Sequence, residues 1–377
     1  MNAELFGSQV NVWVDALVRV LIIVGMMTVV VMGLIWFERK IIGRFQMRLG
    51  PTRTGPFGLL QSVADGLKLV AKEDVRPKNA DPWVFELAPY FVFVPTFLMF
   101  VAVPFAFGFQ VRVLELGLFY VLAVSSVSIV GWVMAGWGSD NRYAMLGALR
   151  AAAQAISYEL PLVMAMIAVA MVAGTLNLQE IVLGQSRLPN IVLQPLPAFI
   201  FFTATLAELN RTPFDIPVGE SEVVGGPFVE YSGIRWSMFF LAEYAAMFIL
   251  ALLGSAIFLG GWAWPMGEQW GASWQLLLTT VKAGAFIFLI FWVRSTLPRM
   301  RVDQLMGFSW KVLLPFGFAQ IMVNGFILVN GWPAVTSGVL LGTTSLAGLF
   351  AVGWIVQRSV SRPRPRPVMM ARSEAAQ

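Results

Sequence analysis

The segment between residues 208 and 243 gathers carboxylates in a largely apolar sequence. It holds six of the 21 acidic residues but only two basic ones, Arg211 and Arg235. The six acids are Glu208, Asp215, Glu220, Glu222, Glu230 and Glu243. Because neighbouring carboxylates and burial both raise the pKa of a carboxyl group, such a cluster can hold and release protons near neutral pH. The pattern favours a proton relay. An acidic loop that docks on a basic partner protein is the alternative, and the two are compatible.

Three ionisable residues lie within apolar stretches: Glu159 just before Pro161, Glu243 and Lys282. Charged groups at membrane depth are costly and commonly mark pathways for ions or protons. We therefore interpret all three as parts of a proton path. A buried ion pair or a water-lined crevice is the alternative explanation for each of them.

The chain contains no cysteine and no histidine. It therefore lacks the thiolates that hold iron–sulfur clusters and the imidazoles that most often bind haem, copper or catalytic zinc. We expect no metal site, no bound cofactor and no catalytic residue in the isolated chain. Electrons must then arrive from a partner protein, while protons move on carboxylates, lysine, tyrosine or water.

The elements that position these groups are predicted to be transmembrane helices. Hydrophobic residues make up 58% of the chain, charged residues only 12%, and the mean hydropathy is +0.74. Runs of about 20 apolar residues can span a bilayer core, and their backbone polar groups are satisfied there as helices. We predict an all-α polytopic membrane protein with about nine spans. They are residues 14–37, 84–107, 116–136, 157–174, 192–209, 236–259, 276–293, 312–331 and 335–356.

Residues 1–360 are predicted to form a single transmembrane domain, followed by a disordered cytoplasmic tail at 361–377. Within the first cytoplasmic loop, apolar residues recur at helical spacing between Phe57 and Val70, with polar residues on the other face. This pattern predicts an amphipathic helix that lies either in the membrane interface or against a partner protein. The predicted cytoplasmic loops are 38–81, 137–156, 210–235 and 294–311.

The basic residues predict the orientation. Those four loops and the residues after the last span, 357–377, carry 22 of the 26 lysines and arginines, whereas the opposite loops carry only Arg112 and Arg187. The positive-inside rule then places the N-terminus outside and the C-terminus in the cytoplasm of a bacterial inner membrane. The basic residues are too dispersed for a nucleic-acid-binding stripe.

Five stretches lie in order on the predicted cytoplasmic side. They are Glu38-Arg39-Lys40 with Gly43-Arg44, Gln46, Arg48 and Gly50-Pro51; Gly58-Leu59-Leu60-Gln61 with Ala64-Asp65, Lys68 and Lys72-Glu73-Asp74; Arg150-Ala151-Ala152-Ala153-Gln154 with Ser157-Tyr158-Glu159; Ala207-Glu208 with Asn210-Arg211-Thr212-Pro213-Phe214-Asp215, running to Glu230-Tyr231-Ser232-Gly233; and Asp303-Gln304-Leu305-Met306 with Trp310-Lys311. Over residues 36–312 the chain thereby resembles the family of quinone-chamber membrane subunits of bacterial NADH:quinone oxidoreductase, the respiratory complex I.

The resemblance implies a membrane protein that lines a quinone chamber and couples quinone reduction to proton translocation. Quinone would be its substrate, the other membrane and peripheral subunits its partners, and FMN and Fe–S clusters would lie on those partners. It assigns the seven acids named above, Glu159 included, to the proton path. It also implies a chamber and entrance at Arg39, Arg44, Arg48, Gln61, Ala64 and Asp65, and a basic arm junction at Arg294, Arg299 and Arg301.

Two positions depart from the family pattern. Ser126 and Val218 stand where members of the family often carry glutamate, so the proton route is expected to differ at both places. Two other functions remain open. The intramembrane charges would also suit a stand-alone ion or solute transporter, and the resemblance also allows the membrane subunit of a related membrane-bound hydrogenase.

Overall fold

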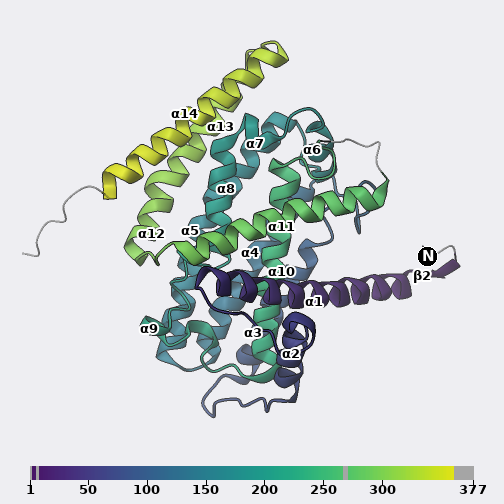
Figure 1. Ribbon diagram of the computed structural model, residues 1–377, viewed down its shortest axis with the longest axis vertical. Coiled ribbons are helices and arrows are strands. Elements are labelled where there is room, and N and C mark those ends of the chain that lie inside the picture. The colour runs from purple at the N-terminus through teal and green to yellow at the C-terminus, as the bar shows by residue number, and fades with distance from the viewer. Residues whose placement is uncertain (1, 6–7, 266–270, 361–377) are drawn as a thin grey trace, which may run out of the picture.

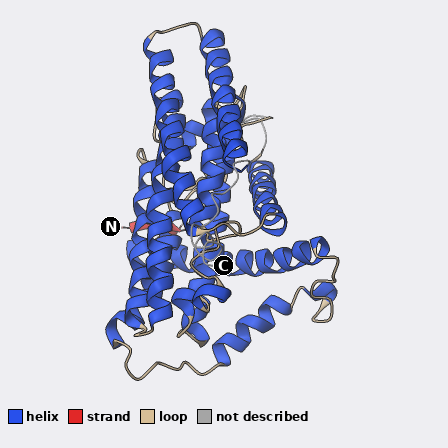
Figure 2. Ribbon diagram, turned by 90° about the vertical axis from the view of Figure 1, so that its left-hand side faces the viewer, coloured by secondary structure: helices blue, strands red, loops and turns tan. Residues whose placement is uncertain are grey.

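The computed structural model describes residues 2–5, 8–265 and 271–360, and the predicted disordered tail at 361–377 lies outside them. The chain is helical almost throughout (Figure 2). A pair of short antiparallel strands, β1 (Asn2–Leu5) and β2 (Ser8–Asn11), precedes the first helix. The expectation of an all-α polytopic membrane protein is confirmed.

Eight helices within the described residues are long and apolar enough to cross a membrane. Seven are single elements: α1 (Val12–Phe45), α3 (Pro82–Met99), α4 (Gly117–Gly138), α5 (Arg142–Ala173), α10 (Gly233–Phe258), α11 (Ala272–Thr296) and α14 (Ala334–Val360). The eighth runs through α12 (Val302–Phe308), a π-helical turn η4 (Ser309–Leu313) and α13 (Leu314–Val329).

The remaining predicted span, 192–209, is a shorter helix, α8 (Pro195–Glu208), which follows the single turn α7 (Asn190–Leu193). Gln194 between them has a non-helical backbone (φ −138°, ψ 62°), as expected for a residue before proline. The 14 residues of α8 extend about 21 Å, less than the ~30 Å of a bilayer core.

Several helices continue past the apolar runs that revealed them. α1 extends to Phe45, eight residues into the predicted loop 38–81, and α5 begins at Arg142 within the predicted loop 137–156. Hydropathy detects the part of a helix that lies in hydrocarbon, whereas backbone hydrogen bonding carries the helix on into polar sequence.

The short elements are η1 (Pro56–Gly58), α2 (Gln61–Ala71), α6 (Leu178–Gly184), α9 (Glu220–Val223) and η2 (Gly226–Phe228).

The expected amphipathic helix is α2. Its apolar side chains Val63, Leu67 and Val70 are exposed in the isolated chain, the last two to 66%. Such a row of exposed apolar side chains needs a covering surface.

Helix α10 forms the centre of the bundle and packs against α3 and α11. α1 and α14 lie at the outside, with α1 crossing one face and α13 and α14 pairing at another (Figure 1). At one end of the bundle, Gly147 of α5 touches Gly226, and a Cβ on Gly147 would stand 2.4 Å from the Cα of Gly226. This close approach holds the loop before α10 against α5, beside the carboxylates.

Candidate functional site

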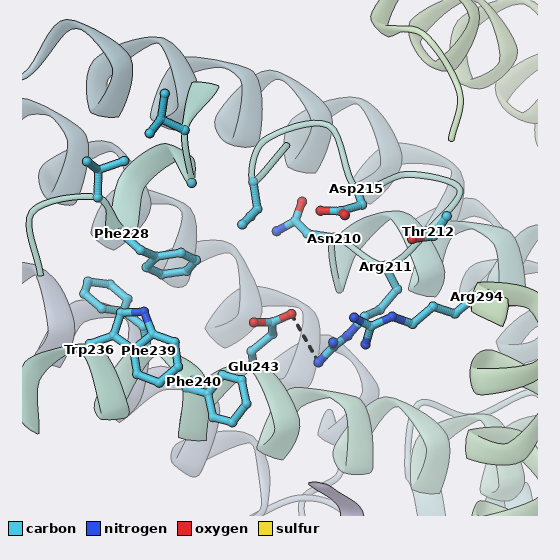
Figure 3. Close-up of a pocket in the computed structure, with 14 residues that line it drawn as sticks. Asn210, Arg211, Thr212, Asp215, Phe228, Trp236, Phe239, Phe240, Glu243 and Arg294 are labelled. Carbon is cyan, nitrogen blue, oxygen red and sulfur yellow. Dashed lines mark ion pairs between the residues drawn. The ribbon is translucent and has the colours of Figure 1, made fainter. Parts of the chain in front are cut away.

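Four charged side chains from four segments meet at this end of the bundle. Glu38 comes from α1, Arg211 from the turn after α8, Glu243 from α10 and Arg294 from the last turn of α11. Arg211 lies 3.2 Å from Glu243 (Figure 3) and 3.8 Å from Glu38, and Arg294 donates to Glu38. Two carboxylates thereby face two guanidinium groups, so the cluster balances its charge internally.

Tyr244 completes this cluster. Its hydroxyl donates to Glu38 at 2.7 Å, and its ring lies 4.6 Å beneath the Arg211 guanidinium. Glu38 and Arg211 are only 4% and 6% exposed. Burial alone would lower the pKa of Arg211, but Glu243, Tyr244 and Glu38 raise it above its ordinary value, so the residue stays a cation. Removing the carboxylates would leave the guanidinium groups buried and unpaired, and removing the guanidinium groups would do the same to the carboxylates.

Gln154 of α5 holds the turn that carries Arg211. Its side-chain amide donates to the carbonyls of Ala207 and Phe214, each at 2.8 Å, and to the side chain of Asn210 at 3.2 Å. Tyr158, one turn further along α5, packs edge-on against the ring of Phe214. The motif around Gln154 and the motif around Arg211 are therefore parts of one structure.

A cavity of about 390 Å³ adjoins the charge cluster. One end is aromatic and the other polar, with Glu243 between them (Figure 3). The aromatic side chains are Phe228, Trp236, Phe239 and Phe240, and the polar ones are Asn210, Arg211, Asp215 and Arg294. The buried Nε of Arg211 has no hydrogen-bond partner among the described residues. An aromatic wall with a buried donor at one end suits a flat, weakly polar ligand.

Two more predicted acids share a second, smaller cavity of about 30 Å³. Glu159 of α5 and Glu208 at the end of α8 line it together with Ser126 of α4 and Asn210. Ser126 hydrogen-bonds to Glu159, whereas the buried Oε2 of Glu208 has no partner among the described residues. Asn210 lines both cavities.

Three further predicted acids have partners of their own. Asp215 pairs with Arg299 at 2.9 Å, Glu222 with Arg150 at 2.6 Å, and Glu230 accepts from Asn141 at 2.6 Å. Glu220 begins α9, and its side chain lies outside the described part of the structure. The segment 208–243 is thus not one cluster. Glu208, Asp215 and Glu243 line the cavities, and Asp215, Glu222 and Glu230 are paired with residues of other segments.

The residues predicted for a chamber entrance lie around α1 and α2. Arg39 pairs with Asp65 at 2.6 Å, and Gln61 donates to Asp65 at 3.1 Å. Arg44 lines a third cavity, of about 340 Å³, between α1 and η1, together with Trp36 and Phe57. Two predicted residues are exposed without lining a described cavity: Ala64, and Arg48, which bonds to Gln46.

The three arginines predicted for an arm junction separate in the structure. Arg294 belongs to the buried cluster, and Arg299 pairs with Asp215. Arg301 is exposed, and its backbone N–H donates to Gln304 at the start of α12.

Lys282 stands apart from the carboxylates. Its ammonium group donates to the carbonyls of Leu259, Gly261 and Trp264, each at 2.6 Å, in the segment that follows α10. These three bonds use all three ammonium donors. The prediction that Lys282 belongs to the proton path is not favoured by this arrangement, which suits a structural role.

Sequence reasoning alone misses Glu38 and Tyr244 as site residues. The prediction assigns Glu38 to the first cytoplasmic loop, because the apolar run ends at Phe37. The signal for it is helical spacing: Met27, Val31, Glu38 and Ile41 are buried and fall on one stripe of α1. No comparable signal marks Tyr244, because aromatic residues are frequent throughout α10.

No group of three or more acidic side chains that could hold a metal ion is found within residues 2–5, 8–265 and 271–360.

The fold and these sites define a polytopic membrane protein with buried, paired carboxylates beside a ligand-sized cavity. The NADH dehydrogenase family model matches residues 18–325, and the chain belongs to this family. A relative from Dehalococcoides mccartyi, the H subunit of an NADH-quinone oxidoreductase, is 45% identical over 348 residues, which cover 92% of this chain and 96% of the relative. Proteins of the same name from Brevibacillus brevis and Geobacillus kaustophilus are 43% identical (87% of this chain, 96% of theirs) and 48% identical (78% and 88%).

Proposed function

We propose that the chain is a membrane subunit of an NADH-quinone oxidoreductase, lines part of its quinone chamber, and couples quinone reduction to proton transfer. Family membership and the names of the relatives support the first part. The observation that carries the coupling is Asn210, which lines both the ligand-sized cavity and the small cavity with Glu159 and Glu208. A charge change in one cavity is thereby felt by carboxylates in the other.

The quinone enters, in this proposal, between α1 and η1 beside Arg44 and passes the Arg39–Asp65 pair. The cavity there is walled by aromatic and aliphatic side chains, with cationic groups at its edge. The cluster of Glu38, Arg211 and Glu243 lies deeper and responds to the charge of the reduced headgroup. Quinone is the substrate in this proposal, and its electrons come from Fe–S clusters on partner subunits that also hold FMN.

Protons move, in this proposal, between the Glu243 cluster and the Glu208–Glu159 pair, with Asp215, Glu220, Glu222 and Glu230 at the rim exchanging them with water. Lys282 is left out because its donors are bound to carbonyls. The two departures from the family pattern both line cavities: Val218 the large one and Ser126 the small one. Each removes an ionisable group from the route.

The chain is proposed to lie in the bacterial inner membrane, with its N-terminus outside and its C-terminus in the cytoplasm. The basic residues of the loops support this orientation. The exposed apolar side chains of α2 are proposed to lie in the interface of the cytoplasmic leaflet. The charge cluster then faces the side from which electrons arrive.

Glu208→Gln tests the coupling. The substitution keeps the shape of the side chain and removes its titratable proton. We expect quinone-linked NADH oxidation and proton translocation by the assembled complex to fall by about 100-fold or more, the range for loss of a positioned proton carrier. NADH oxidation by an artificial acceptor should stay unchanged. Glu115→Gln, at an exposed acid, is the control. Undiminished coupled turnover in an assembled Glu208→Gln complex would contradict the proposal.

Gentle detergent extraction tests whether the chain works in a complex. We expect it to purify in a large assembly that contains flavin and iron, whereas a stand-alone transporter would purify alone. A membrane-bound hydrogenase assembly would contain iron and evolve hydrogen without reducing quinone. Either of these outcomes would replace the proposed function.

A further inference from the structure

The motif at residues 303–311 has no part in the proposed function. It forms α12 and the start of the π-helical turn η4, both of which pack against α5. The Ser309 hydroxyl donates to the backbone carbonyl of Ser157, and the indole N–H of Trp310 donates to the Ser157 hydroxyl at 3.2 Å. The hydroxyl of Tyr158 donates to a carbonyl of α12 at 2.9 Å. Turns of π-helix are rare and frequently occur at functional sites, so these contacts need an explanation.

Pro161 explains why the Ser157 carbonyl needs a donor. In an α-helix the N–H of each residue donates to the carbonyl four residues earlier, so the N–H of residue 161 would bind Ser157. Proline has no N–H, and this bond is therefore missing in the interior of α5, which continues to Ala173. Ser157 and Ser309 are both buried, and Ser309 supplies the donor from the neighbouring helix.

The missing backbone bond lies directly beside Glu159. Ala151, Ala155 and Glu159 form one stripe of α5 that lines the small cavity. Successive residues of a helix differ in direction by about 100°, so Ser157 points away from this stripe. Helices bend where proline interrupts the backbone hydrogen bonds. A bend at Ser157 would move Glu159 relative to Ser126, to which it is hydrogen-bonded.

The segment before α12 contacts the turn that carries Arg211. The backbone N–H of Met300 donates to the Pro213 carbonyl at 3.0 Å, and Arg299 pairs with Asp215 at 2.9 Å. Asp215 and Arg211 both line the large cavity. The segment and α12 together therefore connect a wall of the large cavity to the part of α5 that faces the small one.

We propose that Ser309 is a positioning residue for Glu159. Its hydroxyl replaces the donor that Pro161 lacks, and it thereby fixes the direction of α5 at the point where the carboxylate leaves the helix. The described residues that line the two cavities do not include Ser309, so it acts through the Ser157 carbonyl and not by contact with the quinone. This inference rests on the proposed function, in which Glu159 carries protons.

A double-mutant cycle in the assembled complex tests the pairing of Ser309 with the gap at Pro161. Ser309→Ala removes the donor, and we expect quinone-linked NADH oxidation to fall by as much as about 100-fold, because a misplacement of about 1 Å can cost that much. Pro161→Ala restores a backbone N–H that donates to Ser157 within α5. In the Pro161→Ala background, Ser309→Ala should therefore lose little further activity.

The kinetic constants separate positioning from a general loss of packing. Because Ser309 lies outside the large cavity, the KM for quinone should stay near the parent value while kcat falls. NADH oxidation by an artificial acceptor should not change. Ser255→Ala is the matched control, since it removes an equally buried serine hydroxyl that donates within its own helix, to the Leu252 carbonyl.

Two results would overturn the role of Ser309: an unchanged kcat in Ser309→Ala, or a loss that is equally large in the Pro161→Ala background. If Ser309→Ala lowers the amount of assembled complex, the double variant should recover both the amount and the turnover. Recovery of the amount without the turnover would also overturn it. If Glu208→Gln leaves coupled turnover unchanged as well, the proposed function fails; if Glu208→Gln impairs turnover, only the role of Ser309 fails.

Discussion

Arg211 and Lys282 are both cations within a predominantly apolar bundle, but they are neutralised in different ways. Arg211 faces the carboxylates of Glu38 and Glu243, whereas Lys282 faces three backbone carbonyls. A carboxylate can take up a proton and lose its charge, while a carbonyl dipole is fixed. The charge around Arg211 can therefore change with protonation, whereas the three carbonyls around Lys282 do not titrate.

The two regions also differ in how far apart along the chain their contacting segments lie. The Arg211 cluster joins α1, α10, α11 and the turn after α8, which are far apart in the sequence. Lys282 joins α11 to the segment only 18 to 23 residues before it. The comparison favours the carboxylates around Arg211 over Lys282 as proton carriers, and both assignments stay predictions.

Arg211→Leu should have the largest effect. It leaves Glu38 and Glu243 buried without their shared cation, which typically costs about 3–5 kcal/mol for a buried pair. We expect little assembled complex in membranes and a lowered melting temperature for what remains. Arg211→Lys, which keeps the charge but not the planar fork, should recover part of the yield. A normal melting temperature for Arg211→Leu would show that the cluster is not held by charge.

Lys282→Met should have an intermediate effect of a different kind. It removes the donor to three carbonyls, and a lost hydrogen bond to a buried group costs about 1–3 kcal/mol. We expect a lower melting temperature with an unchanged number of protons translocated per NADH in the assembled complex. A change in that ratio without loss of stability would place Lys282 back on the proton path and remove the contrast with Arg211.

Asp65→Asn should have the smallest effect on stability. The Arg39–Asp65 pair is half-exposed, with side-chain exposures of 44% and 36%, and such pairs contribute about 0–1 kcal/mol. The melting temperature of the complex should barely change, and the small difference should vanish at high salt. A loss as large as that of Arg211→Leu would mean that the pair is buried by a partner protein in the assembly.

Much of the fold followed from local patterns. Apolar runs identified the spans because hydrophobicity over about 20 residues depends on no distant contact. The short α8 was less visible, since proline after Gln194 breaks the helix inside an apolar run. The sequence analysis did not predict the polar extensions of α1 and α5, because a search for apolar runs stops where polar residues begin even though the helix continues.

The candidate site was predicted in its residue types more than in its geometry. The carboxylates of residues 208–243 stood out as a group, but which of them line a cavity and which are paired depends on residues from other segments. The rim partners Arg150, Asn141 and Arg299 lie 72 to 89 residues away along the chain from the acids they contact, and no local pattern assigns them.

By itself the sequence determined that the chain is a helical membrane protein without thiolate or imidazole ligands, because composition and hydropathy need no partner in space. Its ordered motifs also indicated the family. Only the tertiary structure decided that Glu38 joins Arg211, that Lys282 binds carbonyls, and that Ser126 touches Glu159. The physical reason is that a charge acquires its role from the groups around it, and those groups come together only when distant helices pack.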